Sequence, residues 1–297
     1  MRPAWRAGDA RGVDHGGGRC VTRSLATVST ARTTLKVTSA AVDAVRRPAA
    51  GLVVLIYHRV GRRTAVEVDL PAALFDEQMA FLASETVLVT LSDGLARLTD
   101  GGSGARESMV AVTFDDGTAD FVEVALPILA ARAVPVTLYV ATDFVEQGVS
   151  FPDDGVPLSW SALGDAVSSG LVEVGSHTHG HTLLDRLPVA EIDDELDRSI
   201  ELIGDRLSVH AAHFAYPKAV MGSSAADAAV KSRFESAAVA GTRVNPYGAT
   251  DPYRLARSPI QVSDGMRWFR RKVAGGLTFE DTIRRALNRR RYAGATT

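Results

Sequence analysis

Short apolar segments alternate with amphipathic ones from residue 51 onward, and this alternation constrains the fold more than any other feature of the sequence. Short segments that are mainly apolar predict buried strands, and they occupy residues 52–57, 87–91, 109–114, 136–141, 171–174, 213–216 and 237–240. Segments with apolar residues at helical spacing lie between them, at 74–82, 121–133, 160–168 and 189–207. Repeated β-α units of this kind favour a parallel sheet, either closed or open.

Two polar clusters follow apolar segments of this series. Val-Thr-Phe-Asp-Asp-Gly occupies residues 112–117, and His-Thr-His-Gly-His occupies residues 177–181. Parallel α/β folds collect chemical groups at the carboxyl ends of strands, so we expect the two clusters to meet. One carboxylate with the imidazoles of His177 and His181 forms a usual set of metal ligands. The carboxylate left over would act as a base toward water.

These clusters and three further motifs resemble the polysaccharide deacetylase family, also called the NodB-homology domain or carbohydrate esterase family 4. The resemblance covers roughly residues 50–262. Its motifs are Ile-Tyr-His-Arg-Val at 56–60, Thr-Phe-Asp-Asp-Gly at 113–117, Ala-Leu-Pro-Ile-Leu at 125–129, Gly-Ser-His-Thr-His-Gly-His at 175–181 and Phe-Ala-Tyr-Pro at 214–217. The resemblance implies a distorted (β/α) barrel of about seven parallel strands that forms a single catalytic domain.

The family's site residues map onto this sequence one by one. The resemblance implies that Asp116, His177 and His181 bind the metal and that Asp115 is the general base. Zinc is the expected ion, and Co²⁺ or Ni²⁺ would also suit these mixed nitrogen and oxygen ligands. The residue after the proline of the Phe-Ala-Tyr-Pro motif, Lys218, is expected to offer its backbone N–H to the oxyanion of the reaction.

The sequence departs from the family pattern in two places. The family's late histidine, which protonates the leaving amine, has no counterpart, because no histidine follows His213. His58 is the expected substitute, since it follows the first predicted strand and would point toward the Asp-Asp pair; ordering the barrel mouth is its other reading. Members of the family often have an aromatic residue and then glycine after the motif proline, where this chain has Lys218, Ala219 and Val220. Losing a glycine that can adopt positive φ is expected to change this loop.

Several aromatic residues are candidates for contact with a sugar ring. Tyr216 and Trp160 are the expected substrate-binding residues, and Phe144 and Tyr139 are further candidates for a stacking groove. Packing in the core is the alternative for each of them. His179, between the two ligand histidines, is expected to support the loop, and a third imidazole ligand is the less favoured reading.

The predicted activity is metal-dependent hydrolysis of N-acetyl groups from amino sugars in a polysaccharide or glycolipid. A cyclic imide or ureide amidohydrolase on the same fold is one alternative, and a glycan-binding relative with little or no turnover is another. The net charge of −2 speaks against nucleic acid as a partner. The single cysteine, Cys20, excludes an internal disulfide framework and a cysteine-based zinc site.

Composition divides the chain into four predicted parts: a disordered leader at 1–28, a helix and linker at 29–50, the catalytic domain at 51–265 and a basic helical extension at 266–297. A solvated helix face is the first reading of the basic extension, and peripheral contact with an anionic membrane surface is the second. No signal peptide is visible, which favours the cytoplasm, whereas the family resemblance favours the cell envelope.

Overall fold

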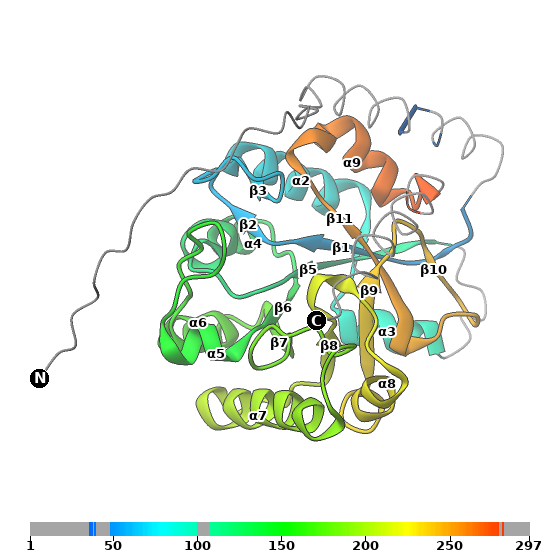
Figure 1. Cartoon of the computed structure of the whole chain (residues 1–297). Coiled ribbons are helices and arrows are strands. Elements are labelled where there is room, and N and C mark those ends of the chain that lie inside the picture. Colours follow the sequence, from blue (N-terminus) through cyan, green and yellow to red (C-terminus); the bar gives the residue numbers. More distant parts are fainter. Residues whose placement is uncertain (1–35, 38, 40–47, 100–106, 279–280, 282–297) are drawn as a thin grey trace, which may run out of the picture.

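A closed barrel of seven parallel strands forms the centre of the structure, a computed structural model that describes residues 36, 37, 39, 48–99, 107–278 and 281. The strands follow the order β1, β11, β9, β8, β7, β6 and β5, and pairing of β5 with β1 closes the ring (Figure 1). Their bounds are Gly51–Tyr57 (β1), Met109–Phe114 (β5), Val136–Val140 (β6), Val172–Ser176 (β7), His213–Ala215 (β8), Ser236–Ala240 (β9) and Leu255–Pro259 (β11). The predicted (β/α) barrel is therefore confirmed.

Among the described residues, four short strands lie outside the ring. Val87–Leu88 (β4) pairs with β5, and Asn245–Pro246 (β10) runs antiparallel to β1. Arg59–Val60 (β2) pairs with Asp69–Leu70 (β3). The strand predicted at 87–91 is shorter than expected, because a helix already begins at Leu91.

Helices surround the barrel, as Figure 1 shows. Their bounds are Ala72–Glu85 (α2), Leu91–Thr99 (α3), Leu126–Ala131 (α4), Thr142–Gln147 (α5), Trp160–Ser168 (α6), Val189–Leu207 (α7), Ser224–Lys231 (α8) and Gly265–Val273 (α9). The helix predicted at 121–133 divides into a π-helical segment, Phe121–Ala125 (η1), and α4. The change occurs beside Pro127, which has no N–H to donate within a regular helix.

Alternating side chains along the strands separate two layers of the core. Val53, Leu55 and their counterparts on other strands pack in the large cluster that includes the helices. Leu52 and Val54 pack in a second cluster, inside the barrel, with residues of the other strands and of α3. Since α3 contributes Leu91, Leu95 and Leu98 to this inner cluster, it closes the amino-terminal end of the barrel. The carboxyl-terminal end is left for chemistry.

The carboxyl ends of four strands carry the candidate residues. Asp115 follows β5, His177 follows β7 and His58 follows β1. The turn Pro217–Ala219 (η2), which contains Lys218, comes shortly after β8. All four strands are parallel members of one ring, so these residues lie at the same end of the barrel.

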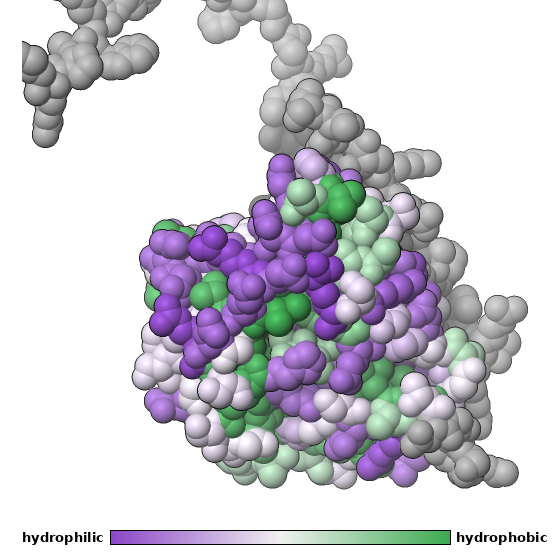
Figure 2. Space-filling model, turned by 90° about the horizontal axis from the view of Figure 1, so that it is seen from below, coloured by the Kyte–Doolittle hydropathy of each residue, from purple (hydrophilic) through white to green (hydrophobic). Residues whose placement is uncertain are grey.

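The outer surface is mainly polar. Figure 2 shows the face on the α7 side, where hydrophilic residues cover most of the area and hydrophobic ones gather near its centre. No described helix is both long enough and apolar enough to span a membrane. The predicted leader at 1–28 and most of the helix and linker predicted at 29–50 lie outside the described residues. The helix α9 occupies the start of the basic extension predicted at 266–297, and the part of it beyond residue 281 is not described.

Candidate active site

The two adjacent carboxylates at the end of β5, Asp115 and Asp116, both lie near the imidazole of His177. Asp116 has a left-handed conformation with φ of 77°, and Gly117 after it has φ of 99°. The Nε2 atom of His177 lies 3.9 Å from Oδ2 of Asp115 and 3.7 Å from Oδ1 of Asp116. An extended chain would have sent these two side chains to opposite sides. The left-handed turn brings both to one site, at a cost in backbone strain that is common in functional sites.

Asp116, His177 and His181 form a compact set of potential metal ligands. One ligand atom from each lies within 4.8 Å of the others. Oδ1 of Asp116 is 3.5 Å from Nε2 of His181 and 3.7 Å from Nε2 of His177. Around a tetrahedral ion with bonds of about 2.1 Å, ligand atoms are about 3.4 Å apart. The donor types and their spacing therefore suit a divalent transition metal.

The hydrogen bond of His177 fixes which ring nitrogen is available. Its Nδ1 donates to the carbonyl oxygen of Ala215, at 2.7 Å, so the lone pair is on Nε2, which faces the carboxylates. Burial lowers the pKa of His177 against the opposing effect of the two aspartates. Burial and the neighbouring His177 lower the pKa of His181 to about 4. Both imidazoles are therefore neutral near pH 7, which is the state that binds metal.

His179 lies between the two ligand histidines in sequence but faces another element. Its Nδ1 is 2.9 Å from Oγ1 of Thr142, and its Nε2 is 3.3 Å from Oδ1 of Asp143. The backbone N–H of Asp143 also donates to the carbonyl oxygen of His179. His179 thus attaches the loop to the start of α5, as the favoured reading of the sequence expected.

A buried arginine, Arg257 of β11, holds Asp115 with both arms of its guanidinium. Nη1 donates to Oδ1 at 2.6 Å and Nη2 donates to Oδ2 at 2.9 Å, and Nη1 also contacts Oγ1 of Thr113 at 3.2 Å. Arg257 is fully buried and Asp115 is 4% exposed. Burial alone would raise the pKa of Asp115, but the charge of Arg257, the charge of His177 and the hydrogen bonds from Arg257 together outweigh it and lower the pKa to about 2. Asp115 is therefore ionised at neutral pH.

The barrel interior is shaped to accept this arginine. The guanidinium carbon of Arg257 lies 4.9 Å from the centre of the Tyr139 ring, a cation–π contact inside the barrel. A Cβ on Gly175 would be 2.6 Å from the Tyr139 ring, so glycine at this position leaves the space that the ring occupies. Tyr139 is fully buried, which makes it part of the barrel interior rather than of a sugar groove.

Comparison with known proteins agrees with this arrangement. The family model for polysaccharide deacetylases matches residues 102–236, which include the Asp-Asp pair and the three histidines. Residues 102–236 are thus similar to the polysaccharide deacetylase family. No curated protein matches the sequence.

Solved structures of deacetylases share the fold of this chain. IcaB from Ammonifex degensii is 24% identical with a TM-score of 0.65, and the match covers 75% of this chain and 98% of IcaB. The deacetylase PplD from Streptococcus pyogenes, in complex with acetate, is 18% identical with a TM-score of 0.66, covering 76% and 99% of the two chains. A de-N-acetylase from Aggregatibacter actinomycetemcomitans is 20% identical with a TM-score of 0.63, covering 74% and 99%.

His58, after β1, lies at the same end of the barrel as Asp115. The Nδ1 atom of His58 is buried without a hydrogen-bond partner among the described residues. A positive charge on His58 contributes to lowering the pKa of Asp115, after the larger effects of burial, Arg257 and His177. An imidazole with an unused nitrogen beside the carboxylate is placed to exchange a proton, and its role as an acid stays a prediction.

The turn after β8 contains two residues with side chains in a left-handed conformation. Lys218 and Ala219 both have positive φ, 54° and 55°. The charge of Lys218 contributes to lowering the pKa of His181, after burial and His177, so this turn borders the metal ligands. Two residues with side chains thus hold a left-handed conformation that usually costs about 1–2 kcal/mol each. The expectation that losing the glycine changes the loop stays a prediction.

The two predicted substrate-binding aromatics lie in different surroundings. Tyr216 is fully buried and packs edge-on against Phe214, with ring centres 4.9 Å apart. Trp160 is partly buried at the start of α6 and donates its indole N–H to Glu146 at 2.7 Å. Phe144 is the aromatic residue beside the ligands, with its ring centre 6.4 Å from that of His181. Contact of Tyr216 and Trp160 with a sugar stays a prediction.

Sequence reasoning missed Arg257. The residue stands in a short segment, Leu-Ala-Arg-Ser-Pro, that is neither apolar throughout nor regularly alternating. Its signal becomes visible only after β11 is known to be a barrel strand, because a charged residue inside a buried strand needs a partner of opposite charge.

Proposed function

We propose that this protein removes N-acetyl groups from amino sugars in a polysaccharide or glycolipid, in a metal-dependent hydrolysis. The observation that carries the proposal is the pairing of Arg257 with Asp115 beside the triad of Asp116, His177 and His181, at distances of 2.6 and 2.9 Å. Membership in the polysaccharide deacetylase family supports the substrate class. A buried, ionised carboxylate beside a ligand triad is what hydrolysis by an activated water requires.

Each residue has a separate task in this proposal. A zinc ion, or Co²⁺ or Ni²⁺, held by Asp116, His177 and His181 would polarise the acetyl carbonyl and acidify water at the site. Asp115 accepts the proton of the attacking water, and Arg257 keeps the carboxylate oriented toward it. The backbone N–H of Lys218 donates to the oxyanion of the tetrahedral intermediate. His58 gives a proton to the leaving amine.

The primary test measures metal content and acetate release from N-acetylglucosamine oligomers for the wild type and Asp115→Asn. We expect about one ion per chain in both proteins and a rate about 10²–10⁴-fold lower in the variant, because only the base is removed. Asp76→Asn is the matched control, since Asp76 is 48% exposed and pairs with Arg132 on the outer surface. Full activity in Asp115→Asn would refute the assignment of the base.

The same assay distinguishes the alternatives. A wild type that binds metal but releases no acetate from any amino-sugar polymer would favour a cyclic imide or ureide substrate, or a glycan-binding role without turnover. A wild type that binds no metal would contradict the triad itself. His58→Ala with unchanged turnover would remove His58 from the mechanism and leave the leaving amine to be protonated by another group.

A further inference from the structure

The charge of the chain is divided unevenly between the barrel and the sequence after it. Residues 51–265 contain 15 Lys and Arg against 30 Asp and Glu, a net charge of −15. Residues 266–297 contain nine Lys and Arg against two Asp and Glu, a net charge of +7. The overall net charge of −2 conceals this separation. An anionic surface would repel the barrel and attract the segment that begins with α9.

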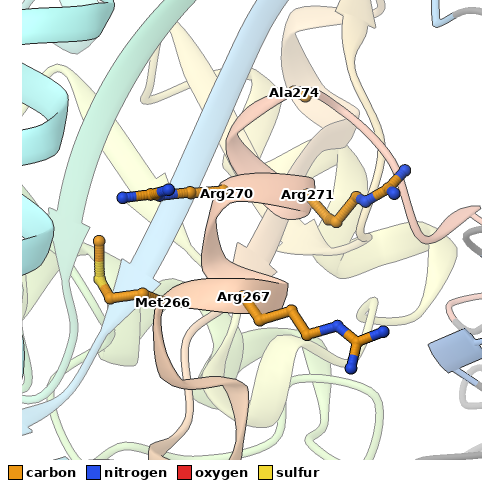
Figure 3. A pocket seen from close by; sticks show the side chains of 5 residues that line it. All are labelled: Met266, Arg267, Arg270, Arg271 and Ala274. Carbon is orange, nitrogen blue, oxygen red and sulfur yellow. The ribbon is translucent and has the colours of Figure 1, made fainter.

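Three arginines lie on the exposed side of α9. Arg267, Arg270 and Arg271 are exposed, whereas Trp268 and Phe269 on the other side of the helix are buried. Together with Met266 and Ala274, the arginines line an open hollow of about 680 Å³ (Figure 3). Figure 3 shows Arg267 and Arg271 extending to the same side, and Arg270 and Met266 to the other.

Two of these arginines have their guanidinium groups over aromatic rings, and their charge has no carboxylate partner among the described residues. The guanidinium of Arg267 lies 4.6 Å from the centre of the Trp268 ring, and that of Arg270 lies 5.0 Å from the centre of the Phe81 ring. Within the described parts of the chain, none of the three forms an ion pair with a carboxylate. Lys272 on the same helix behaves differently, since its ammonium is buried 2.6 Å from Asp264. The uncompensated charge of α9 is thus confined to its outer face.

We propose that this arginine face, Arg267, Arg270 and Arg271, docks the protein on the surface of an anionic phospholipid bilayer. One guanidinium group can donate two parallel hydrogen bonds to a phosphate, and it loses its water more easily than an ammonium group does. The three groups lie on the outer surface of a single helix, and no other described element encloses them as a groove would enclose one polymer chain. An open array suits a broad layer of phosphates. Repulsion of the acidic barrel would favour the orientation in which α9 faces the lipid.

The test measures sedimentation of the full chain with vesicles at low ionic strength. Vesicles of phosphatidylcholine with about 30% phosphatidylglycerol are compared with phosphatidylcholine alone, and salt is then raised to about 0.5 M to screen the contact. We expect binding to the anionic vesicles alone and release by salt. Arg267→Gln/Arg271→Gln should bind at least about tenfold more weakly, because each basic side chain near an anionic bilayer adds to the attraction.

A matched variant distinguishes the effect of the arginine face from the effect of the total charge of the protein. Arg97→Gln/Arg198→Gln removes two charges from exposed positions on α3 and α7 and should bind like the wild type. Equal weakening in both variants, undiminished binding in the α9 variant, or equal binding to neutral vesicles would each overturn the proposal. So would tight binding of inorganic polyphosphate without binding to vesicles, because the ligand would then be a polymer. Acetate release does not enter this assay, so its outcome is independent of the proposed function.

Discussion

Two buried carboxylates of this protein are both neutralised by cations, but they differ in how many of their hydrogen-bond acceptor positions are used. Asp264 accepts hydrogen bonds from Lys36 at 2.7 Å, from Lys272 at 2.6 Å and from the backbone N–H of Gln261 at 2.8 Å. Asp115 is held by Arg257 alone among the cations, although both of its oxygens are engaged. The oxygens of Asp115 keep lone pairs that face His177.

The backbone is more strained around Asp115 than around Asp264. The Asp115 region contains several left-handed residues with side chains, Asp116, His181, Lys218 and Ala219. The Asp264 cluster joins Lys36 to α9 with regular helix beside it. A carboxylate held by two ammonium groups and a backbone N–H in regular surroundings stabilises the fold, whereas one with more free acceptor positions in strained surroundings is prepared for chemistry. The difference predicts that mutations will separate stability from activity.

The largest expected effect is on stability, from Asp264→Asn. The amide would present its NH₂ group to one of the two buried ammonium groups, leaving a buried charge without a partner. We expect the free energy of unfolding to fall by about 3–5 kcal/mol, the usual result of removing one member of a buried ion pair. Urea denaturation measures the change. Acetate release per folded molecule should stay at the wild-type value, since Asp264 lies outside the candidate active site.

The difference in the free energy of unfolding between wild type and Asp264→Asn should also depend on pH. Burial alone would raise the pKa of Asp264, but the charges of Lys272 and Lys36 outweigh it and lower the pKa. A lowered pKa stabilises the fold fully above the pKa of an unfolded aspartate, about 3.9, and this stabilisation is lost as the pH falls through the folded value. The stability gap between wild type and Asp264→Asn should therefore narrow below about pH 4. A constant gap down to pH 2 would contradict the ion-pair explanation.

Arg257→Lys should have the next largest effect, on turnover. Lysine keeps the positive charge but cannot hold both oxygens of Asp115 as the planar fork does. We expect kcat to fall by about tenfold to a hundredfold through misplacement of the base. KM and metal content should stay the same, because neither substrate nor metal depends on Arg257. The rate and the KM are measured on N-acetylglucosamine oligomers.

Arg254→Lys is the matched control for this substitution. Arg254 lies three residues earlier, is 38% exposed and pairs with Asp227 at 3.1 Å. Exposed ion pairs contribute about 0–1 kcal/mol, so its rate should not change. An equal fall in kcat for both variants would show that Arg257 acts through the fold rather than by orienting Asp115. A loss of bound metal in Arg257→Lys would show the same.

The same contrast explains how much the sequence could predict. Strands such as β1, β5 and β6 were predictable because each is mainly apolar and buried on both faces. The strand β11 was not, since its Arg257 is buried through the ion pair with Asp115 rather than through hydrophobicity. The helix α3 was hidden by its position directly after β4, where the apolar Leu91 seemed to continue the strand.

The candidate site shows the same limit. Asp116, His177 and His181 are close in space as the motifs predicted, because the carboxyl ends of parallel strands lie at the same end of one barrel. The partner of Asp115 comes from a strand 142 positions away in the sequence, with no motif to mark it. The left-handed conformations of Lys218 and Ala219 were also beyond prediction, since neither residue favours them.

The smallest expected effect tests whether strain is stored at the barrel mouth. Ala219 has φ of 55°, so Ala219→Gly should relieve strain and raise the free energy of unfolding by about 0.5–1 kcal/mol, after the entropy that glycine adds to the unfolded chain. Ala274 at the end of α9 has φ of −75°, where the same substitution should lower it by about 0.5–1 kcal/mol. Changes of opposite sign in the free energy of unfolding of the two variants, measured by thermal or urea denaturation, would locate the strain beside Lys218. A loss of stability in both variants would mean that the turn is relaxed, and the contrast between the two carboxylate regions would then rest on their hydrogen bonds alone.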